Sequence, residues 1–319
     1  MEIILGIERL SRPFVNPVVT LGNFDGVHLG HRKIFARIKE EASRGNGEAV
    51  VMTFDPHPLK VLAPDRCPPL LTSFRKKMAL IEASGIETVL CIPFTKAFSQ
   101  MSPSVFVKEI MVDKVAVKKI IVGYNYHFGK NKEGNVETLR RLGKSLSVDV
   151  DVMDPWIVDG TVVSSSRIRT LIKAGDLETA AKLLGREFSV SGPVVEGAKR
   201  GRTLGFPTAN VAMSDQVTPR SGVYAVEVLW NGLLFDGVAN IGVNPTFRPD
   251  PSEGKAKVSF EVYILDFDRN IYGDEIEVSF KKRIRDEVRF GSTSELIDHI
   301  QSDVRWAREN VFKKRMDGN

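Results

Sequence analysis

A short glycine-rich segment carries two histidines that could bind a polyphosphate. Residues 21–31 read LGNFDGVHLGH, with His28 and His31 placed among Gly22, Gly26 and Gly30. Glycines let the backbone approach a phosphate closely, and a helix that follows offers unpaired N–H groups at its start. The two imidazoles add hydrogen-bond donors to the same anion. The spacing is neither the dinucleotide-binding GxGxxG nor the P-loop GxxxxGK[ST].

Two histidines above a helix start suit a reaction at the α-phosphate of a nucleoside triphosphate such as ATP. Such a reaction needs stabilisation of the charge that develops on that phosphate. It needs no protein nucleophile when the attacking group is itself a phosphate. A single loop histidine is usually structural, but His28, His31, Asp25 and the three glycines within so short a span favour a site.

A second candidate phosphate-binding segment spans residues 197–210, GAKRGRTLGFPTAN. Its cations and glycines could surround phosphates with positive charge and backbone N–H groups. The residues concerned are Gly197, Lys199, Arg200, Gly201 and Arg202. Thr208 and Asn210 supply oxygen ligands of the kind that Mg²⁺ prefers beside phosphate oxygens. A basic surface turn is the alternative interpretation of the glycines and cations alone.

Glu261 is a candidate general base. Residues 258–264 alternate apolar and polar side chains, which places Glu261 on the polar face of a strand. Its carboxylate could accept the proton of a hydroxyl group that attacks a γ-phosphate. A glutamate on the polar face of a strand is more often simply solvated.

The first half of the chain must hold the two histidines at the edge of a parallel sheet. Apolar runs at 17–21, 49–54, 88–92 and 119–122 predict buried strands. Helical periodicity after Gly30 and after Pro103 predicts helices between them. This alternation is typical of an α/β fold, which presents its ligands at the carboxyl ends of the strands.

The pattern changes to a period of two after Leu184. Strands are predicted at 188–195, 223–229, 233–241, 258–265 and 275–280, and one helix at about 292–310. Several strands and a single helix indicate a small antiparallel β-barrel closed by a C-terminal helix. We place the hinge near Gly185, which gives domains of residues 1–184 and 185–319.

The composition is that of an ordinary globular protein, with 42% hydrophobic and 27% charged residues. The net charge of +5 suits nucleotide phosphates as well as nucleic acid. No apolar tract is long enough for a transmembrane helix, and the N-terminus lacks the layout of a signal peptide. Cys67 and Cys91 lie outside any CxxC pattern, which argues against a disulfide scaffold or a zinc site. We expect a cytoplasmic protein.

Four blocks of the first half resemble, in order, those of the bacterial FAD synthetases of the nucleotidylyltransferase superfamily. Residues 22–31 are similar to the GxFDGxHxGH signature of that family. The resemblance implies catalytic roles for His28 and His31. It implies contacts with ATP or FMN for the rest of the block, namely Gly22, Phe24, Asp25, Gly26 and Gly30. Residues 53–58, TFDPHP, resemble a block near the flavin, which implies contacts by Phe54 and His57.

The two remaining blocks add polar residues to the same site. Residues 122–129, VGYNYHFG, resemble the VGxxFxFG stretch and imply that Asn125 lies at the ATP/FMN site. Residues 164–169, SSSRIR, resemble the SSTxIR segment that binds the triphosphate, and the residues implied are Ser164, Ser165, Ser166 and Arg169. Hydroxyls followed by arginine at a helix start form an anion cradle. His127 stands where an arginine is common, a change that could weaken a phosphate contact.

The second half resembles the riboflavin kinases. The stretch GRTLGFPTAN is similar to their signature and implies that Thr208 and Asn210 lie near Mg²⁺-ATP, and residues 237–247 resemble a block that contains Asn240. Residues 260–273 resemble the ExxxLDF…YG block, whose glutamate is the general base, and this implies that role for Glu261. Residues 285–290 resemble the RxExxF segment beside the flavin, which implies a contact by Arg285.

The resemblance thus implies a Rossmann-like nucleotidylyltransferase domain followed by a small antiparallel β-barrel domain with a C-terminal helix. It implies phosphorylation of riboflavin to FMN and adenylylation of FMN to FAD, with ATP and Mg²⁺ in both reactions. We expect a monomer or weak homo-oligomer with no nucleic-acid or membrane partner. One alternative is that only one activity is retained. The other is a basic, non-enzymatic nucleic-acid-binding protein, which the scattered basic residues disfavour.

Overall fold

The computed structural model of the protein describes residues 1–197, 201, 204–213, 215–243 and 258–312. The chain divides into two compact units, Met1–Ser165 and Ser166–Asn319. The boundary at residue 184, expected from the sequence, stays a prediction. No helix of the described residues is long and apolar enough to cross a membrane.

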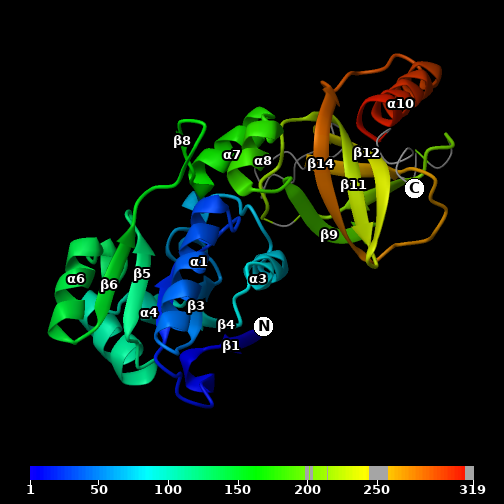
Figure 1. The fold of residues 1–319 in the computed structure, drawn as a ribbon. Coiled ribbons are helices and arrows are strands. Elements are labelled where there is room, and N and C mark those ends of the chain that lie inside the picture. Colours follow the sequence, from blue (N-terminus) through cyan, green and yellow to red (C-terminus); the bar gives the residue numbers. More distant parts are fainter. Residues whose placement is uncertain (198–200, 202–203, 214, 244–257, 313–319) are drawn as a thin grey trace. The chain divides into compact units, whose positions relative to one another are not determined.

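The first unit is built on a six-stranded parallel sheet with the order β1-β4-β3-β2-β5-β6 (Figure 1). Its strands are β1 (Glu2–Leu5), β2 (Val18–Leu21), β3 (Ala49–Asp55), β4 (Thr88–Pro93), β5 (Lys119–Gly123) and β6 (Asp149–Met153). The chain runs from β2 outward to β3 and β4, and later returns to place β5 on the other side of β2. The carboxyl ends of β2 and β5 therefore flank a switch point, where open parallel sheets bind ligands.

Helices cover both faces of this sheet. Phe35 and Ile38 of α1 (Leu29–Arg44) and Ile81 of α3 (Phe74–Ala83) pack into one hydrophobic cluster. The opposite cluster holds Leu139 of α6 (Val136–Ser145) and apolar residues of a π-helical segment, Phe106–Lys114. Shorter helices are α2 (Pro58–Leu62), α4 (Lys96–Ser99) and α5 (Pro103–Val105), with 3₁₀ turns at Ile7–Arg9, Pro64–Arg66 and Lys130–Lys132 and a small hairpin of β7 (Ile157–Val158) and β8 (Thr161–Val162). The parallel α/β prediction is confirmed.

The second unit contains a closed antiparallel barrel with the order β10-β13-β12-β11-β14-β9. Its strands are β9 (Ser189–Val195), β10 (Thr208–Val211), β11 (Gly222–Trp230), β12 (Leu233–Val243), β13 (Val258–Ile264) and β14 (Glu275–Arg285). Two helices, α7 (Ser165–Ala174) and α8 (Leu177–Leu184), precede the barrel. The C-terminal helix α10 (Thr293–Ala307) continues into a π-helical turn, Arg308–Phe312, and packs Ala307 and Phe312 against Val223 and Val238 of the barrel. The predicted barrel and closing helix are confirmed.

Three strands of these sheets have no counterpart in the sequence analysis. β1 is an edge strand with mostly exposed side chains, and β6 alternates acidic and apolar residues. β10 has only four residues, and its sequence TANV reads as part of a loop. Strands this short or this polar do not stand out from the sequence, and pairing with neighbouring strands fixes them.

Candidate functional site

The glycine-rich segment lies where the sequence analysis placed it, between β2 and α1. His28 is the N-cap of α1, and its Nδ1 accepts a hydrogen bond from the backbone N–H of His31 at 3.3 Å. When the His28 ring is neutral, its proton must then lie on Nε2, the nitrogen that does not take part in this cap. The two imidazole rings stack with centroids 3.6 Å apart and planes inclined by 18°. The predicted histidine pair is thus one compact donor unit at a helix start.

The environment of His31 keeps its ring neutral. Burial lowers the pKa of His31 well below its ordinary value, and the charges of His28 and Lys77 lower it further. Its Nδ1 atom is buried and has no hydrogen-bond partner among the described residues. A neutral imidazole still donates one N–H. His31 can therefore donate a hydrogen bond to an oxyanion in its neutral form.

Asp25 is placed to support the segment. Its buried carboxylate accepts hydrogen bonds from the backbone N–H groups of Leu71, at 2.9 and 3.0 Å, and Thr72, at 3.1 Å. Gly26 adopts a φ of 84° and donates its N–H to the hydroxyl of Thr72. These contacts clamp the histidine segment onto the chain before α3. A contact of Asp25 with ATP or FMN stays a prediction.

We expect Asp25→Ala to destabilise the first unit by about 3 kcal/mol, because it leaves the buried N–H groups of Leu71 and Thr72 without an acceptor. Urea unfolding followed by circular dichroism measures this loss. Asp25→Asn is the matched control, because its amide oxygen can still accept one of these bonds. Equal stability of Asp25→Ala and the wild type would contradict the clamping role.

The TFDPHP block lies at the end of β3, beside the histidine segment. Phe54 packs its ring edge-on against Phe94, with centroids 5.7 Å apart. His57 caps α2 by accepting the N–H of Leu59 on Nδ1, and its Nε2 lies 3.4 Å from the side-chain amide of Asn23. Asn23 thus joins the two blocks. Asn23 was not among the predicted site residues, because it occupies the variable position of the GxFDG signature.

The block after β5 exposes both of its polar residues. Asn125 is exposed, and the carbonyl of Asn125 accepts a hydrogen bond from Nδ1 of His127 at 2.9 Å. His127 therefore bonds to its own turn through one ring nitrogen. Because β5 neighbours β2, Asn125 follows the strand on the other side of the switch point from the histidine segment.

The serine block is divided between the two units. Ser165 opens α7 and donates its hydroxyl to the carbonyl of Asp25 at 2.9 Å, which ties this block to the histidine segment. Ser164 is half-buried just before it. Ser166 and Arg169 belong to the second compact unit, where Ser166 is exposed and Arg169 is buried. A contact of Ser166 and Arg169 with a triphosphate stays a prediction.

In the barrel, three polar residues form a row across neighbouring strands. Asn210 of β10 pairs directly with Glu261 of β13, which pairs in turn with Asn240 of β12. The hydroxyl of Thr208 lies 3.5 Å from Oε2 of Glu261. A side chain at Gly197 would collide with the amide of Asn210, so glycine lets the chain pass over the row. The row brings the predicted base, the predicted oxygen ligands and Asn240 together.

Arg285 has an ion-pair partner within the protein. Its guanidinium forms a bidentate pair with the buried carboxylate of Asp303 on α10, at 2.9 Å from Nε to Oδ1 and 2.7 Å from Nη2 to Oδ2. Beside it, Glu287 lies against Gly242, next to Asn240. The pair anchors the segment after β14 on the C-terminal helix, and a contact of Arg285 with flavin or nucleotide stays a prediction.

Part of the second candidate segment lies outside the described residues, namely Lys199, Arg200 and Arg202, as do residues 244–247 of the block that contains Asn240. Gly201 is described and half-buried. The predicted phosphate contacts of these cations therefore rest on the sequence alone.

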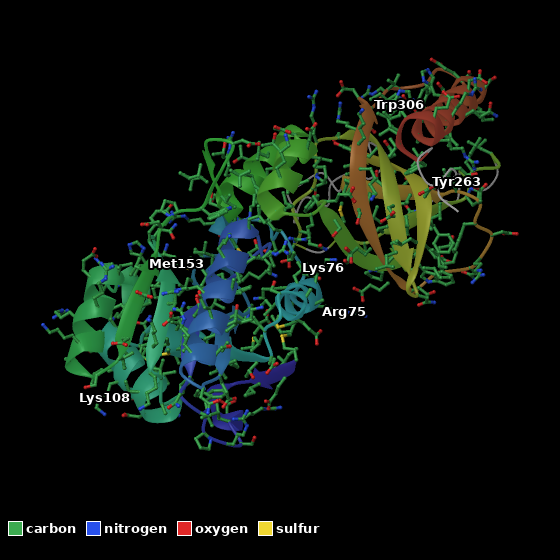
Figure 2. All side chains as sticks on the ribbon, in the orientation of Figure 1. Arg75, Lys76, Lys108, Met153, Tyr263 and Trp306 are labelled. Carbon is green, nitrogen blue, oxygen red and sulfur yellow. The ribbon has the colours of Figure 1, made fainter. Side chains whose placement is uncertain are left out.

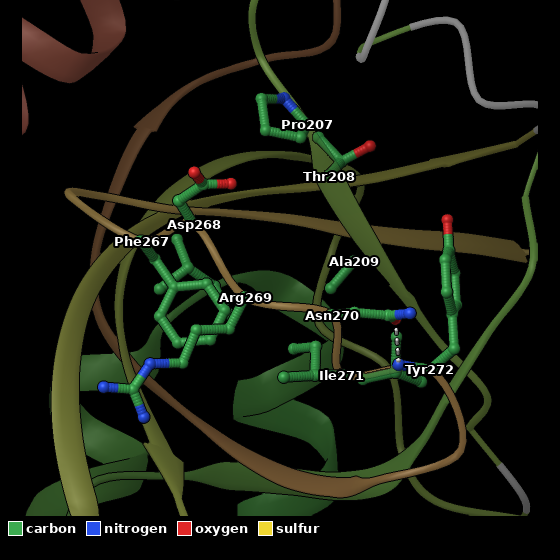
Figure 3. Close-up of a pocket in the computed structure, with 11 residues that line it drawn as sticks. Pro207, Thr208, Ala209, Phe267, Asp268, Arg269, Asn270, Ile271 and Tyr272 are labelled. Carbon is green, nitrogen blue, oxygen red and sulfur yellow. Dashed lines mark hydrogen bonds between the residues drawn. The ribbon is translucent and has the colours of Figure 1, made fainter.

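A pocket of about 400 Å³ lies beside the polar row (Figure 3). Pro207, Thr208 and Ala209 of the PTAN stretch line it on one side. Residues 267–272, which connect β13 to β14, line it opposite and include Phe267, Arg269 and Tyr272. Apolar and aromatic walls with a few polar groups are typical of a small-molecule binding site. Tyr272 and Gly273 belong to the kinase-like block of residues 260–273, but no sequence pattern indicates a pocket there.

Comparison with known proteins assigns a separate enzyme family to each half of the chain. Residues 13–167 match the family model described as FAD synthetase, and residues 184–311 match the one described as riboflavin kinase. The bifunctional riboflavin kinase/FMN adenylyltransferase of Escherichia coli K12 is 39% identical, and that of Pseudomonas fluorescens is 36% identical, each over 97% of both chains. A solved structure, described as a macrolide-efflux protein from Streptococcus pneumoniae, is 30% identical with a TM-score of 0.84 and covers 97% of this chain and 99% of its own.

Proposed function

Because the chain belongs to the family of bifunctional riboflavin kinases/FMN adenylyltransferases, we propose that the two sites described above divide its two reactions between them. The enzyme phosphorylates riboflavin to FMN in its C-terminal half and adenylylates FMN to FAD in its N-terminal half, with ATP as a substrate of both reactions. The single observation that best supports the division is the row of Asn210, Glu261 and Asn240, since it gives the barrel a complete set of polar groups of its own.

In the kinase reaction, Glu261 acts as the general base. As the terminal hydroxyl of riboflavin attacks the γ-phosphorus of ATP, Glu261 accepts the hydroxyl proton and ADP leaves. Thr208 lies within reach of the Glu261 carboxylate and orients it. Because its side chain is only half-buried, Glu261 can meet a substrate without a large rearrangement.

Thr208 and Asn210 fit the magnesium ion that this reaction needs. A hydroxyl and an amide oxygen beside a carboxylate form an all-oxygen donor set, which suits a hard cation that is shared with phosphate oxygens. Bound there, Mg²⁺ would neutralise charge on the phosphates of ATP.

The pocket next to Thr208 takes the adenosine of this ATP. Thr208 belongs both to the pocket wall and to the polar row, so a nucleotide that fills the pocket extends its phosphates toward Glu261. Tyr272 and Phe267 supply the aromatic surface against which a base can stack.

Tyr272→Ala is therefore expected to raise the KM for ATP in riboflavin phosphorylation by about tenfold, the usual effect of losing one base–aromatic contact. FAD formation from supplied FMN should not change. Leu234→Ala, at an exposed position outside the pocket, is the matched control. An unchanged KM for ATP in Tyr272→Ala would place the base elsewhere.

In the adenylylation reaction, the phosphate of FMN attacks the α-phosphorus of ATP and pyrophosphate leaves. His28 and His31 donate hydrogen bonds to the oxygens on which negative charge develops, helped by N–H groups at the start of α1. No covalent enzyme intermediate is needed, because the attacking group is already an anion. In this proposal Phe54 and His57, at the end of the neighbouring strand, contact FMN.

Incubation of the purified protein with riboflavin, ATP and Mg²⁺, followed by chromatography of the flavins, tests the whole assignment. FMN followed by FAD is the expected result. FMN alone would favour the alternative in which only one activity is retained. Retention on DNA without ATP turnover would favour the nucleic-acid-binding alternative.

We also propose that the enzyme works in the cytoplasm as a monomer or weak homo-oligomer on riboflavin, FMN and ATP. Cys67 and Cys91 form no disulfide, which suits a reducing compartment. Sedimentation at several protein concentrations measures the association state directly.

A further inference from the structure

Lys77 of α3 buries its ammonium group beside the histidine segment. The side chain of Lys77 is one of the few charged ones in the core, with 8% of the residue exposed. Its Nζ donates to the hydroxyl of Thr53 at 3.1 Å and to the carbonyls of Asn23 and Phe54 at 3.3 Å each. An ammonium group has three N–H donors, so these contacts use all of them.

Stability does not explain a lysine at this position. Burial lowers the pKa of Lys77, and no ion pair of the described residues includes it. Its helix neighbours Met78 and Ile81 pack into a hydrophobic cluster, where an apolar side chain would fill space without desolvating a charge. A buried charge without a counter-ion is more typical of a functional site.

The three acceptors come from two segments of the active site. The carbonyl of Asn23 belongs to the segment that carries His28 and His31, while Thr53 and Phe54 lie near the end of the strand β3, which leads to His57. Thr53 also donates its hydroxyl to the carbonyl of Asn23 at 3.4 Å. The ammonium of Lys77 therefore joins the segment assigned to ATP to the segment assigned to FMN.

We propose that Lys77 is a positioning residue for FMN adenylylation, which fixes these two segments so that the FMN phosphate meets the α-phosphate of ATP. The proposal rests on the proposed function, in which the first unit binds both substrates. A shift of about 1 Å between reacting groups lowers a rate by about a hundredfold. Each segment keeps its own substrate contacts, so affinity for either substrate should change far less than the rate of the chemical step.

The test is the kcat and KM of FAD formation from FMN and ATP in Lys77→Met. We expect kcat to fall by about a hundredfold, with both KM values within about threefold of wild type. Lys77→Arg keeps a charged donor and should recover part of kcat. Lys76→Met is the matched control. Lys76 directly precedes Lys77 on α3, where Figure 2 labels it, and successive residues of an α-helix lie about 100° apart around its axis. A kcat of Lys77→Met within threefold of wild type would overturn the proposal.

Thr53→Val supplies a second test that does not remove a buried charge. It deletes one acceptor of Lys77 with little change in volume, and kcat should fall by about tenfold with unchanged KM values. In the double variant Lys77→Met with Thr53→Val, the two reductions in kcat should not multiply, because both substitutions remove the hydrogen bond between Lys77 and Thr53. Full kcat in Thr53→Val would overturn the proposal even if Lys77→Met does not fold. Failure of the wild type to form FAD would instead overturn the proposed function.

Discussion

Glu261→Gln is expected to lower kcat for riboflavin phosphorylation by about a thousandfold. The amide fills the same space between Asn210 and Asn240 but cannot accept the proton of the riboflavin hydroxyl. The measurement is FMN formation from riboflavin and ATP, with the KM for ATP expected to stay within a few-fold of wild type. The same protein should still convert supplied FMN to FAD.

Glu277→Gln is the matched control for this variant. Glu277 is a half-buried glutamate on β14, outside the polar row, and its amide should leave kcat unchanged. If Glu261→Gln kept more than a tenth of the wild-type kcat, Glu261 would not be the base. If it lost both activities equally, the two sites would not act independently.

His31→Ala is expected to lower FAD formation from FMN and ATP by two to three orders of magnitude, as loss of one oxyanion donor usually does. The stacked partner His28 should also be held less firmly, because it loses the ring that packs face to face against its own, while the hydrogen bond from the backbone N–H of residue 31 to its Nδ1 remains. Riboflavin phosphorylation by the same protein should continue, so FMN should accumulate.

A double variant sharpens this expectation. If the two histidines act as one donor unit, His28→Ala combined with His31→Ala should be little worse than the stronger single variant. His299→Ala, on the C-terminal helix, is the control and should leave FAD formation intact. A full rate of FAD formation in His31→Ala would remove the histidine pair from the mechanism.

The sequence was sufficient to predict those features that depend on periodicity. The apolar runs marked β2, β3, β4 and β5 to within about a residue, and the alternation around Glu261 placed it correctly on the polar side of β13. β10 was missed because four residues that include Asn210 carry no strand signal. It forms because β9 and β13 lie on either side of it.

The contacts between distant segments could not be predicted in the same way. Asp25 matched a ligand-binding block, yet its carboxylate holds Leu71 and Thr72, residues far along the chain. Arg285 matched a flavin block and is paired with Asp303. Such partners are set by tertiary packing, and no spacing within one segment encodes them.

The row of Asn210, Glu261 and Asn240 limits how β13, the strand that carries Glu261, can change in evolution. Side chains alternate between the two faces of a strand, so a single inserted or deleted residue before Glu261 would turn its carboxylate into the apolar interior of the barrel. In the closed barrel, β13 is hydrogen-bonded to β10 on one side and to β12 on the other. It therefore cannot shift its pairing register to compensate for the added or missing residue. Relatives can thus vary this strand by substitution, while changes in length are confined to the loops at its ends.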